Sequence, residues 1–277
     1  MKNQWNTSDP PPAPPCDITF FVACYNEEGG IIGTLETLVS ALHEMRITYD
    51  IVVVDDASRD RSVELIQAFV AAHPEEPIQL LVNEMNAGVG NNYAEAAFHG
   101  GGAYYRMVCG DDVESKETLL QILKRLGEAD MILCYHDGPK VRNWSRRAIS
   151  RSFTGMVNFL GGYKIKYYNG LPVCHRSDVM RWHSNAHGFG FQADLVVRLL
   201  DLGANYIEIP VVPQERASGA TKAFTLTNFC SVIHTLLDIA IRRSARIIYP
   251  ERFTKPLARR REHLARERAS EIPASAS

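Results

Sequence analysis

The sequence has no apolar run long enough to cross a membrane as a helix, since no stretch reaches about 18 uninterrupted apolar residues. The opening residues, MKNQWNTSDPPPAPP, also lack the apolar core of a secretory signal. We therefore expect no transmembrane helix, and we interpret residues 1–16 as a disordered, Pro-rich leader. The six cysteines form no CxxC pair and no zinc-type spacing, so we expect reduced thiols and a cytoplasmic protein.

Two nucleotide-binding fingerprints are also missing. The best Gly-rich loop, NAGVGNNY at 86–93, places Tyr93 where the GxGxxG pattern needs its third glycine, and the chain has no Walker A lysine motif. The formal net charge of −2 argues against nucleic acid as a partner. Positive charge gathers in residues 242–268, which hold ten Lys or Arg against three Glu. The rest of the chain is therefore acidic.

What the chain does have is a regular alternation of strand and helix patterns. Its 277 residues, 45% of them hydrophobic, suffice for one large α/β domain or two small ones. Apolar runs predict strands at 18–23, 50–56, 78–82, 104–109 and 130–135, and helical periodicity falls between them at 31–45, 61–73, 91–99 and 117–126. This order predicts a mostly parallel sheet with helices on both faces, which binds ligands at the carboxyl ends of its strands.

Acidic residues follow two of these predicted strands. Asp111, Asp112 and Glu114 come after an apolar run that ends at Gly110, and Asp55 and Asp56 end an earlier strand. Carboxylates this close repel one another unless a cation lies between them. The alternative is a turn before a helix, where Asp and Ser are good caps and acids suit the helix dipole.

Six motifs in order resemble family 2 of the inverting glycosyltransferases: ACYNEE (23–28), VVVDDASRD (52–60), NAGVG (86–90), GDDVE (110–114), GFGFQADLVVRLLDLGANYIEIPV (188–211) and ERASGATK (215–222). The last two are similar to the dolichol-phosphate mannosyltransferase, or polyprenyl-phosphate glycosyltransferase, branch. The resemblance implies a GT-A fold, a single α/β domain over residues 17–226. Its first half would bind a nucleotide-sugar and its second half an acceptor.

The resemblance also implies a donor site and a metal site. A GDP- or UDP-sugar would lie on Tyr25, Asn26, Glu27, Asp55, Asp56 and Gly88. Mg²⁺ or Mn²⁺, which prefer oxygen ligands, would bind Asp111 or Asp112, with Glu114 as a possible second ligand. The chain departs from the family in two places: the first Asp of the D-x-D motif is replaced by Cys109 or Gly110, and Val89 stands where many relatives have a basic residue.

For the acceptor, the branch implies a polyprenyl phosphate held by arginines. A helix over 145–160 would place Arg147 and Arg151 on one face, and Arg216 and Lys222 lie in the ERASGATK loop. The other interpretation of 140–151 is a solvated basic face. Under the first interpretation, the acceptor phosphate attacks the anomeric carbon in line with the departing diphosphate, and Asp111, Asp112, Asp194 and Arg216 are the candidate catalytic residues.

Two rival functions remain open. One is transfer to a hydroxyl acceptor, which needs a general base, and Asp194 in FQAD is the candidate. The other is a non-catalytic nucleotide-sugar-binding protein, suggested by the altered D-x-D motif. A nucleotidyltransferase is disfavoured because the acidic CYNEEGG occupies the place of a basic Gly-rich loop.

Residues 227–248 have the apolar spacing of an amphipathic helix, followed by a basic tail, 249–277, that we expect to be flexible. The helix would either pack on the domain or lie on a membrane surface with the help of the tail. In the second case the protein is peripheral on the inner face of the membrane.

Overall fold

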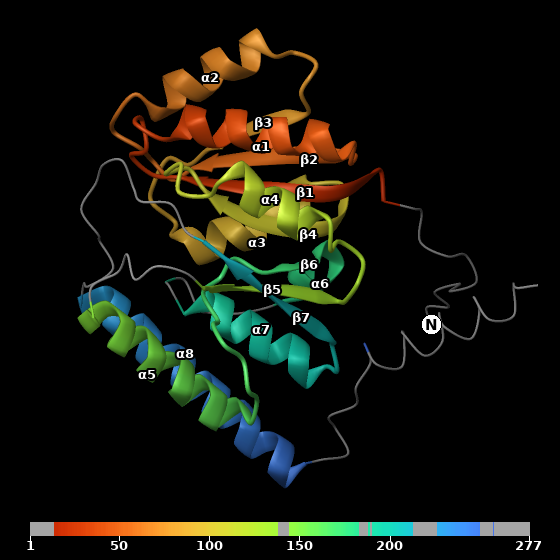
Figure 1. The fold of residues 1–277 in the computed structure, drawn as a ribbon. Coiled ribbons are helices and arrows are strands. Elements are labelled where there is room, and N and C mark those ends of the chain that lie inside the picture. The colour runs from red at the N-terminus through yellow and green to blue at the C-terminus, as the bar shows by residue number, and fades with distance from the viewer. Residues whose placement is uncertain are drawn as a thin grey trace, which may run out of the picture.

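The computed structural model describes residues 14–137, 144–182, 188, 190–212, 226–249 and 257, with the backbone alone for 144–146 and 226–230. One seven-stranded sheet forms the centre, in the order β3-β2-β1-β4-β6-β5-β7 (Figure 1). The strands are β1 (Cys16–Cys24), β2 (Tyr49–Asp55), β3 (Ile78–Val82), β4 (Gly102–Cys109), β5 (Met131–His136), β6 (Val173–His175) and β7 (Tyr206–Val211). The helices are α1 (Ile31–Met45), α2 (Ser62–Ala72), α3 (Val89–His99), α4 (Lys116–Leu123), α5 (Trp144–Gly161), α6 (Arg176–Met180), α7 (Phe191–Asp201) and α8 (Leu226–Ile248).

Only β6 runs against its neighbours. It is antiparallel to both β4 and β5, so β5 and β7 point the same way as β1, β2, β3 and β4. The carboxyl ends of these six strands therefore meet at one edge, which we call the C-terminal edge. The predicted fold class, a mostly parallel α/β domain, is confirmed.

The sheet carries a core on each face because its strands are apolar on both sides. Phe20 and Val22 of β1 pack in the cluster that α1, α2 and α4 cover, whereas Phe21 packs in the cluster that α3, α6 and α7 cover. This is the pattern of a strand buried on both faces. The predicted placement of helices on both faces is confirmed as well (Figure 1).

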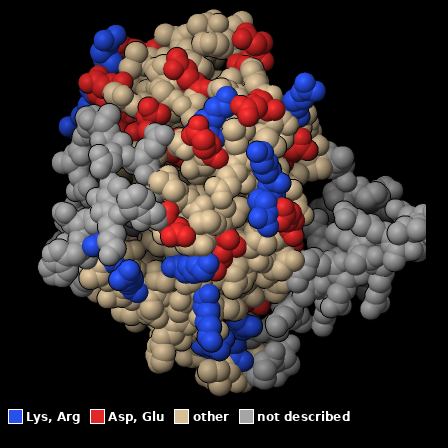
Figure 2. All heavy atoms as spheres, in the orientation of Figure 1, with Lys and Arg blue, Asp and Glu red and all other residues tan. Residues whose placement is uncertain are grey.

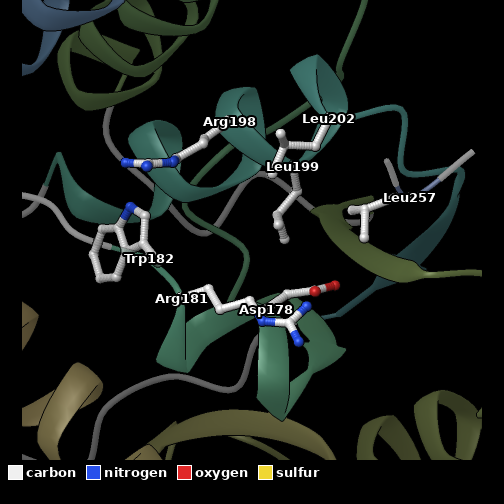
Figure 3. A pocket seen from close by; sticks show the side chains of 7 residues that line it. All are labelled: Asp178, Arg181, Trp182, Arg198, Leu199, Leu202 and Leu257. Atoms are coloured by element: carbon white, nitrogen blue, oxygen red, sulfur yellow. The ribbon is translucent and has the colours of Figure 1, made fainter. Parts of the chain in front are cut away.

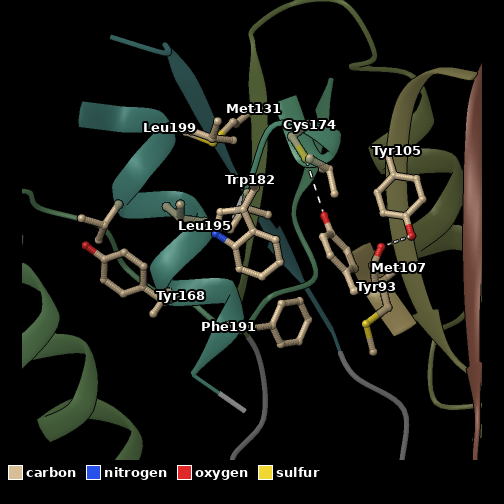
Figure 4. Packing of buried hydrophobic residues seen from close by; sticks show 14 of the residues in the cluster. Tyr93, Tyr105, Met107, Met131, Tyr168, Cys174, Trp182, Phe191, Leu195 and Leu199 are labelled. Atoms are coloured by element: carbon tan, nitrogen blue, oxygen red, sulfur yellow. Dashed lines mark hydrogen bonds between the residues drawn. The ribbon is translucent and has the colours of Figure 1, made fainter. Parts of the chain in front are cut away.

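An aromatic cluster ties the second half of the chain to the first (Figure 4). The ring of Tyr93 on α3 lies 5.0 Å from Phe191 on α7 and 6.1 Å from Trp182, measured between centroids. The Tyr105 hydroxyl on β4 donates to the Tyr93 carbonyl at 2.7 Å. The first turn of α7 is thereby fixed against α3 and β4.

Helices α5 and α8 lie side by side at one end of the molecule, and α8 also packs on α7 (Figure 1). The expected helix at 227–248 is therefore part of the fold. Within the described ranges, no helix is long and apolar enough to span a bilayer. The expected leader overlaps the fold by one residue, because β1 begins at Cys16. The tail beyond residue 249 is described only at Leu257, whose N–H donates to the Leu202 carbonyl at 3.2 Å.

Candidate active site

The loops after β1 and β2 interlock at the C-terminal edge. Side chains of each loop accept hydrogen bonds from backbone N–H groups of the other loop, at donor–acceptor distances of 2.8–3.1 Å. The N–H groups of Asn26, Glu27 and Glu28 donate to Ser58, Ser62 and Asp60, respectively, and those of Arg59 and Arg61 donate to Asn26 and Glu28. Asn26 adopts a left-handed backbone, φ 54°. Tyr25, the residue before Asn26, is 39% exposed. Its aromatic ring therefore lies at the surface, next to loops whose backbone is fixed by hydrogen bonds.

Asp55 and Asp56, which we expected to bind the nucleotide-sugar, hold the neighbouring loops in place. Asp55 is fully buried and accepts the N–H of Ser58 at 2.9 Å, closing a turn. Because α2 begins only at Ser62, this turn is not the helix cap that the alternative interpretation predicted. Asp56, 6% exposed, accepts the N–H groups of Ala87 at 2.8 Å and Gly88 at 3.0 Å.

The Asp56 carboxylate thus fixes the loop that leads into α3. Asn83 also donates to it from the end of β3, at 2.9 Å. Gly88 has φ 83°, a conformation that glycine adopts without strain. Three loops, after β1, β2 and β3, are therefore joined at the C-terminal edge around two buried acids.

Asp111 and Asp112 follow β4 at the same edge. The loop is held by the Gly110 N–H, which donates to the Ala23 carbonyl at 2.9 Å, and by the Asp112 N–H, which donates to Thr34 at 3.0 Å. The Asp112 carboxylate lies against α1, where a Cβ on Gly33 would be 2.5 Å from it. Burial, with the charges of Asp111 and Glu36, raises the pKa of Asp112 above its usual range.

Glu114 does not lie in this acidic group. Its two carboxylate oxygens accept from the guanidinium of Arg106 at 2.5 and 2.8 Å, and Arg106 is 1% exposed. Burial disfavours the charged guanidinium, but the Glu114 carboxylate outweighs this, so that the pKa of Arg106 is raised. The expectation that Glu114 is a second metal ligand is therefore corrected, because its charge neutralises the buried guanidinium of Arg106. In the described part of the chain, no group of three or more His, Cys, Asp or Glu is arranged to hold a metal.

The second half of the chain reaches the C-terminal edge through the first turn of α7. Gln192 accepts the Leu171 N–H at 2.9 Å. The neighbouring Gly170 packs so closely on β5 that a Cβ there would be 1.8 Å from the Cys134 carbonyl. The first turn of α7 is thus held beside the end of β5, on the side of the edge opposite the donor loops.

Asp194 lies in that turn and is 1% exposed. One carboxylate oxygen accepts the indole N–H of Trp182 at 2.9 Å, and the other forms an ion pair with Arg242 of α8. The sequence indicated Asp194 but not its two partners. The one sign of Arg242 in the sequence is helical periodicity, which places residues 231, 235, 242 and 246 on the same face of α8.

The predicted acceptor arginines are only partly placed. Arg147 is half-buried and Arg151 exposed, one turn apart on α5. Arg216 and Lys222 lie outside the described residues. On the face drawn in Figure 2, Lys and Arg side chains of the described residues are interspersed with Asp and Glu.

One cavity, of about 240 Å³, shares only Trp182 with the groups of the candidate site described above. It is formed between α6 and the second half of α7, and Figure 3 shows its lining residues: Asp178, Arg181, Trp182, Arg198, Leu199, Leu202 and Leu257. None of the donor loops contributes to it. We therefore do not assign it to the candidate site at the C-terminal edge.

Comparison with known sequences identifies the class of enzyme to which this fold and candidate site belong. The sequence model of the family described as "Glycosyl transferase family 2" matches residues 19–185, which is more than half of the chain. The chain belongs to this family, and the expected glycosyltransferase class is confirmed.

The relatives include enzymes named for polyprenyl-phosphate acceptors. The chain is 26% identical over 212 residues to an undecaprenyl-phosphate mannosyltransferase of Micrococcus luteus, with 73% of this chain and 85% of that protein covered. It is 26% identical over 234 residues to a polyprenol monophosphomannose synthase of Mycolicibacterium smegmatis, with 80% and 86% covered. The resemblance to this branch is therefore confirmed.

Solved structures share the fold. Glucosyl-3-phosphoglycerate synthase from Mycobacterium tuberculosis, in complex with Mg²⁺ and UDP, superposes with a TM-score of 0.60 at 16% identity, with 82% of this chain and 80% of that chain covered. TarS 1–349 of S. aureus, in complex with UDP-GlcNAc, superposes with a TM-score of 0.56 at 16% identity, with 80% and 66% covered. At this identity the comparison establishes the GT-A fold alone.

Proposed function

We propose that this chain transfers a sugar, with inversion, from a GDP- or UDP-sugar to a polyprenyl phosphate, in a reaction that uses Mg²⁺ or Mn²⁺. The observation that carries the proposal is the meeting of three elements at the C-terminal edge: the Tyr25 loop, the loop held by Asp56 and the acids after β4. The names of the relatives support the acceptor class.

The donor half would bind the nucleotide on the paired loops. Tyr25 offers an exposed ring for the base, and Asn26 and Glu27 lie beside it on a backbone fixed by hydrogen bonds. Asp56 acts chiefly by holding the backbone of 87–88 in place. A preformed loop of this kind lowers the entropic cost of binding.

Asp111 and Asp112 would hold the divalent cation. Bound there, it would neutralise the charge that develops on the departing diphosphate. Burial and the charges of Asp111 and Glu36 together disfavour ionisation of Asp112, and a bound cation would relieve the repulsion between these carboxylates. Since the Asp112 carboxylate is turned toward Gly33, we assign the principal ligand role to Asp111.

The acceptor phosphate would be held by Arg147 and Arg151, together with Arg216 and Lys222 of the ERASGATK loop. A phosphate monoester is already anionic at neutral pH and needs no base to become a nucleophile. Its oxygen forms a bond to the anomeric carbon as the bond from that carbon to the diphosphate oxygen breaks, which inverts the configuration. Catalysis would come mainly from positioning and charge stabilisation.

A lipid acceptor requires contact with a membrane, and the outer face of α5 and α8 suits this contact. On α8, polar and basic residues face the protein: Thr235 is fully buried, and Arg242 and Arg246 pair with Asp194 and Asp201. Apolar side chains of α8 are exposed, and α5, which packs beside α8, carries others. We call them together the apolar face: Ile149 54%, Met156 45%, Phe159 87%, Ile233 41%, Leu237 56%, Ile241 65% and Ile248 64% exposed. We therefore propose peripheral attachment to the cytoplasmic side of the membrane through this face.

The test is a screen of nucleotide-sugar donors against acceptors with purified protein, with and without EDTA. We expect transfer to a short-chain polyprenyl phosphate, lost in EDTA and restored by Mn²⁺ or Mg²⁺. Asp111→Asn should lower the rate by about 10² or more. Glu117→Gln is the matched control because it removes an exposed carboxylate close by in sequence, in the first turn of α4. Transfer only to hydroxyl acceptors, or full activity of Asp111→Asn in EDTA, would contradict the proposal.

A further inference from the structure

Asp194 is the candidate base for transfer to a hydroxyl acceptor, yet its surroundings suit another task. Both carboxylate oxygens are engaged, one by the Trp182 indole and one by the Arg242 guanidinium, and the side chain is 1% exposed. A general base must reach the proton that it abstracts. A carboxylate buried between an indole N–H and a guanidinium does not offer an oxygen to an acceptor hydroxyl.

The Arg242 partner comes from α8, so Asp194 joins two helices. Seven residues further along α7, Asp201 pairs with Arg246 of α8 and accepts the Tyr163 hydroxyl at 2.6 Å. The two ion pairs lie at opposite ends of α7, and only the first lies in the turn at the C-terminal edge.

Close packing fixes α8 at the same end. A Cβ on Gly190 would be 2.1 Å from the Thr235 hydroxyl oxygen, and a Cβ on Gly188 would be 2.5 Å from that of Ser231. The residues just before α7 therefore meet small polar residues of α8 with no space between them. Arg242 follows two turns later on the same face of α8 and completes the contact.

Helix α5 packs against α8 in turn, and α5 carries Arg147 and Arg151, which we have proposed to hold the acceptor phosphate. Contacts thus link Asp194 through Arg242 and α8 to α5, the helix that carries these arginines. We infer that Asp194 is a positioning residue, which through Arg242 holds α8 and α5 at the acceptor side of the site. The inference rests on the proposed function.

Three variants test it in the full-length protein: Asp194→Asn, Arg242→Gln and the two together. Each single change removes the same ion pair. We expect each to raise the KM for a short-chain polyprenyl phosphate about tenfold or more, with kcat changed less than about threefold. The double variant should be no worse than either single variant, because residues that act through one interaction are not additive. Arg242→Lys keeps the charge and should restore part of the affinity.

Arg246→Gln is the matched control, since it removes an ion pair of the same kind between the same helices. It should lower thermal stability while leaving the acceptor KM near the wild-type value. If Arg246→Gln raises the KM equally, the Asp194 pair only stabilises the fold. If Asp194→Asn abolishes kcat and removes the acid limb of the pH–rate profile while Arg242→Gln remains active, Asp194 is a base.

Hydrogen exchange provides a readout that does not depend on activity. In Asp194→Asn and Arg242→Gln, the amides of residues 231–242 should exchange faster, because the contact that holds this part of α8 is lost. Unchanged exchange in both variants would overturn the inference. Failure of the wild-type protein to use any polyprenyl phosphate would contradict the proposed function instead, and the exchange result would still stand.

Discussion

Replacing Glu114 by Gln should destabilise the protein strongly, although Glu114 lies only two residues from the candidate metal ligand Asp112. The change would leave the Arg106 guanidinium, 1% exposed, without its carboxylate partner. Removing one member of a buried ion pair typically costs about 3–5 kcal/mol of unfolding free energy. In a domain of this size, 1 kcal/mol shifts Tm by roughly 2–4 °C. We therefore expect Tm to fall by about 6–20 °C in a scan of the metal-free protein.

The double variant Arg106→Leu/Glu114→Leu separates this structural role from metal binding. Replacing a whole buried ion pair by apolar residues is often neutral or stabilising, so the double variant should regain most of the lost Tm. Its affinity for Mn²⁺, measured by calorimetry with UDP present, should match that of the wild-type protein. A double variant as unstable as Glu114→Gln would refute the ion-pair argument. A tenfold loss of Mn²⁺ affinity would restore Glu114 as a ligand.

Two further predictions concern the donor loop and the apolar face. Asp56→Asn places an amide opposite the N–H groups of Ala87 and Gly88. Since a hydrogen bond to a charged group contributes about 1.5–3 kcal/mol, the affinity for UDP or GDP, measured by calorimetry, should fall at least tenfold. An unchanged affinity would contradict the role of Asp56 in holding this loop. The double variant Leu237→Glu/Ile241→Glu should float less with anionic vesicles than the wild-type protein. Phe98→Glu, which changes an exposed apolar residue on α3, should float as the wild type does. Equal flotation of the wild type and both variants would exclude the apolar face as the attachment surface.

The architecture and the position of the site could be predicted from the sequence because both depend on local patterns. Apolar runs of strand length alternate with helical periodicity, and this fixes a parallel sheet. Acids directly after two of those runs must lie at its C-terminal edge. The three-residue strand β6 was missed, since VCH has no pattern of its own. Its pairing is decided by β4 and β5 on either side.

The direction of individual side chains could not be predicted, because it depends on residues far apart in the chain. Glu114 turns to Arg106, although the arginine within the apolar run YYRMVC was an available sign that a buried partner was needed. Asp194 meets Arg242 across 48 positions of sequence, and the basic character of 242–268 suggested a solvated or membrane-facing segment. In the structure Arg242 and Arg246 of that segment face the protein instead.

The short antiparallel strand β6 has a consequence for how the molecule is divided. On each side it pairs at only two positions, whereas β1 pairs with β2 and with β4 at seven each. The sheet is thus a four-stranded block carrying the donor loops and a two-stranded block, β5 and β7, joined by a narrow seam. Few backbone hydrogen bonds cross that seam, and the aromatic cluster of Tyr93, Trp182 and Phe191 provides much of the remaining contact. Changes in β5, β7 and the helices around them therefore reach the loops after β1, β2 and β3 mainly through side-chain packing rather than through the backbone hydrogen bonds of the sheet.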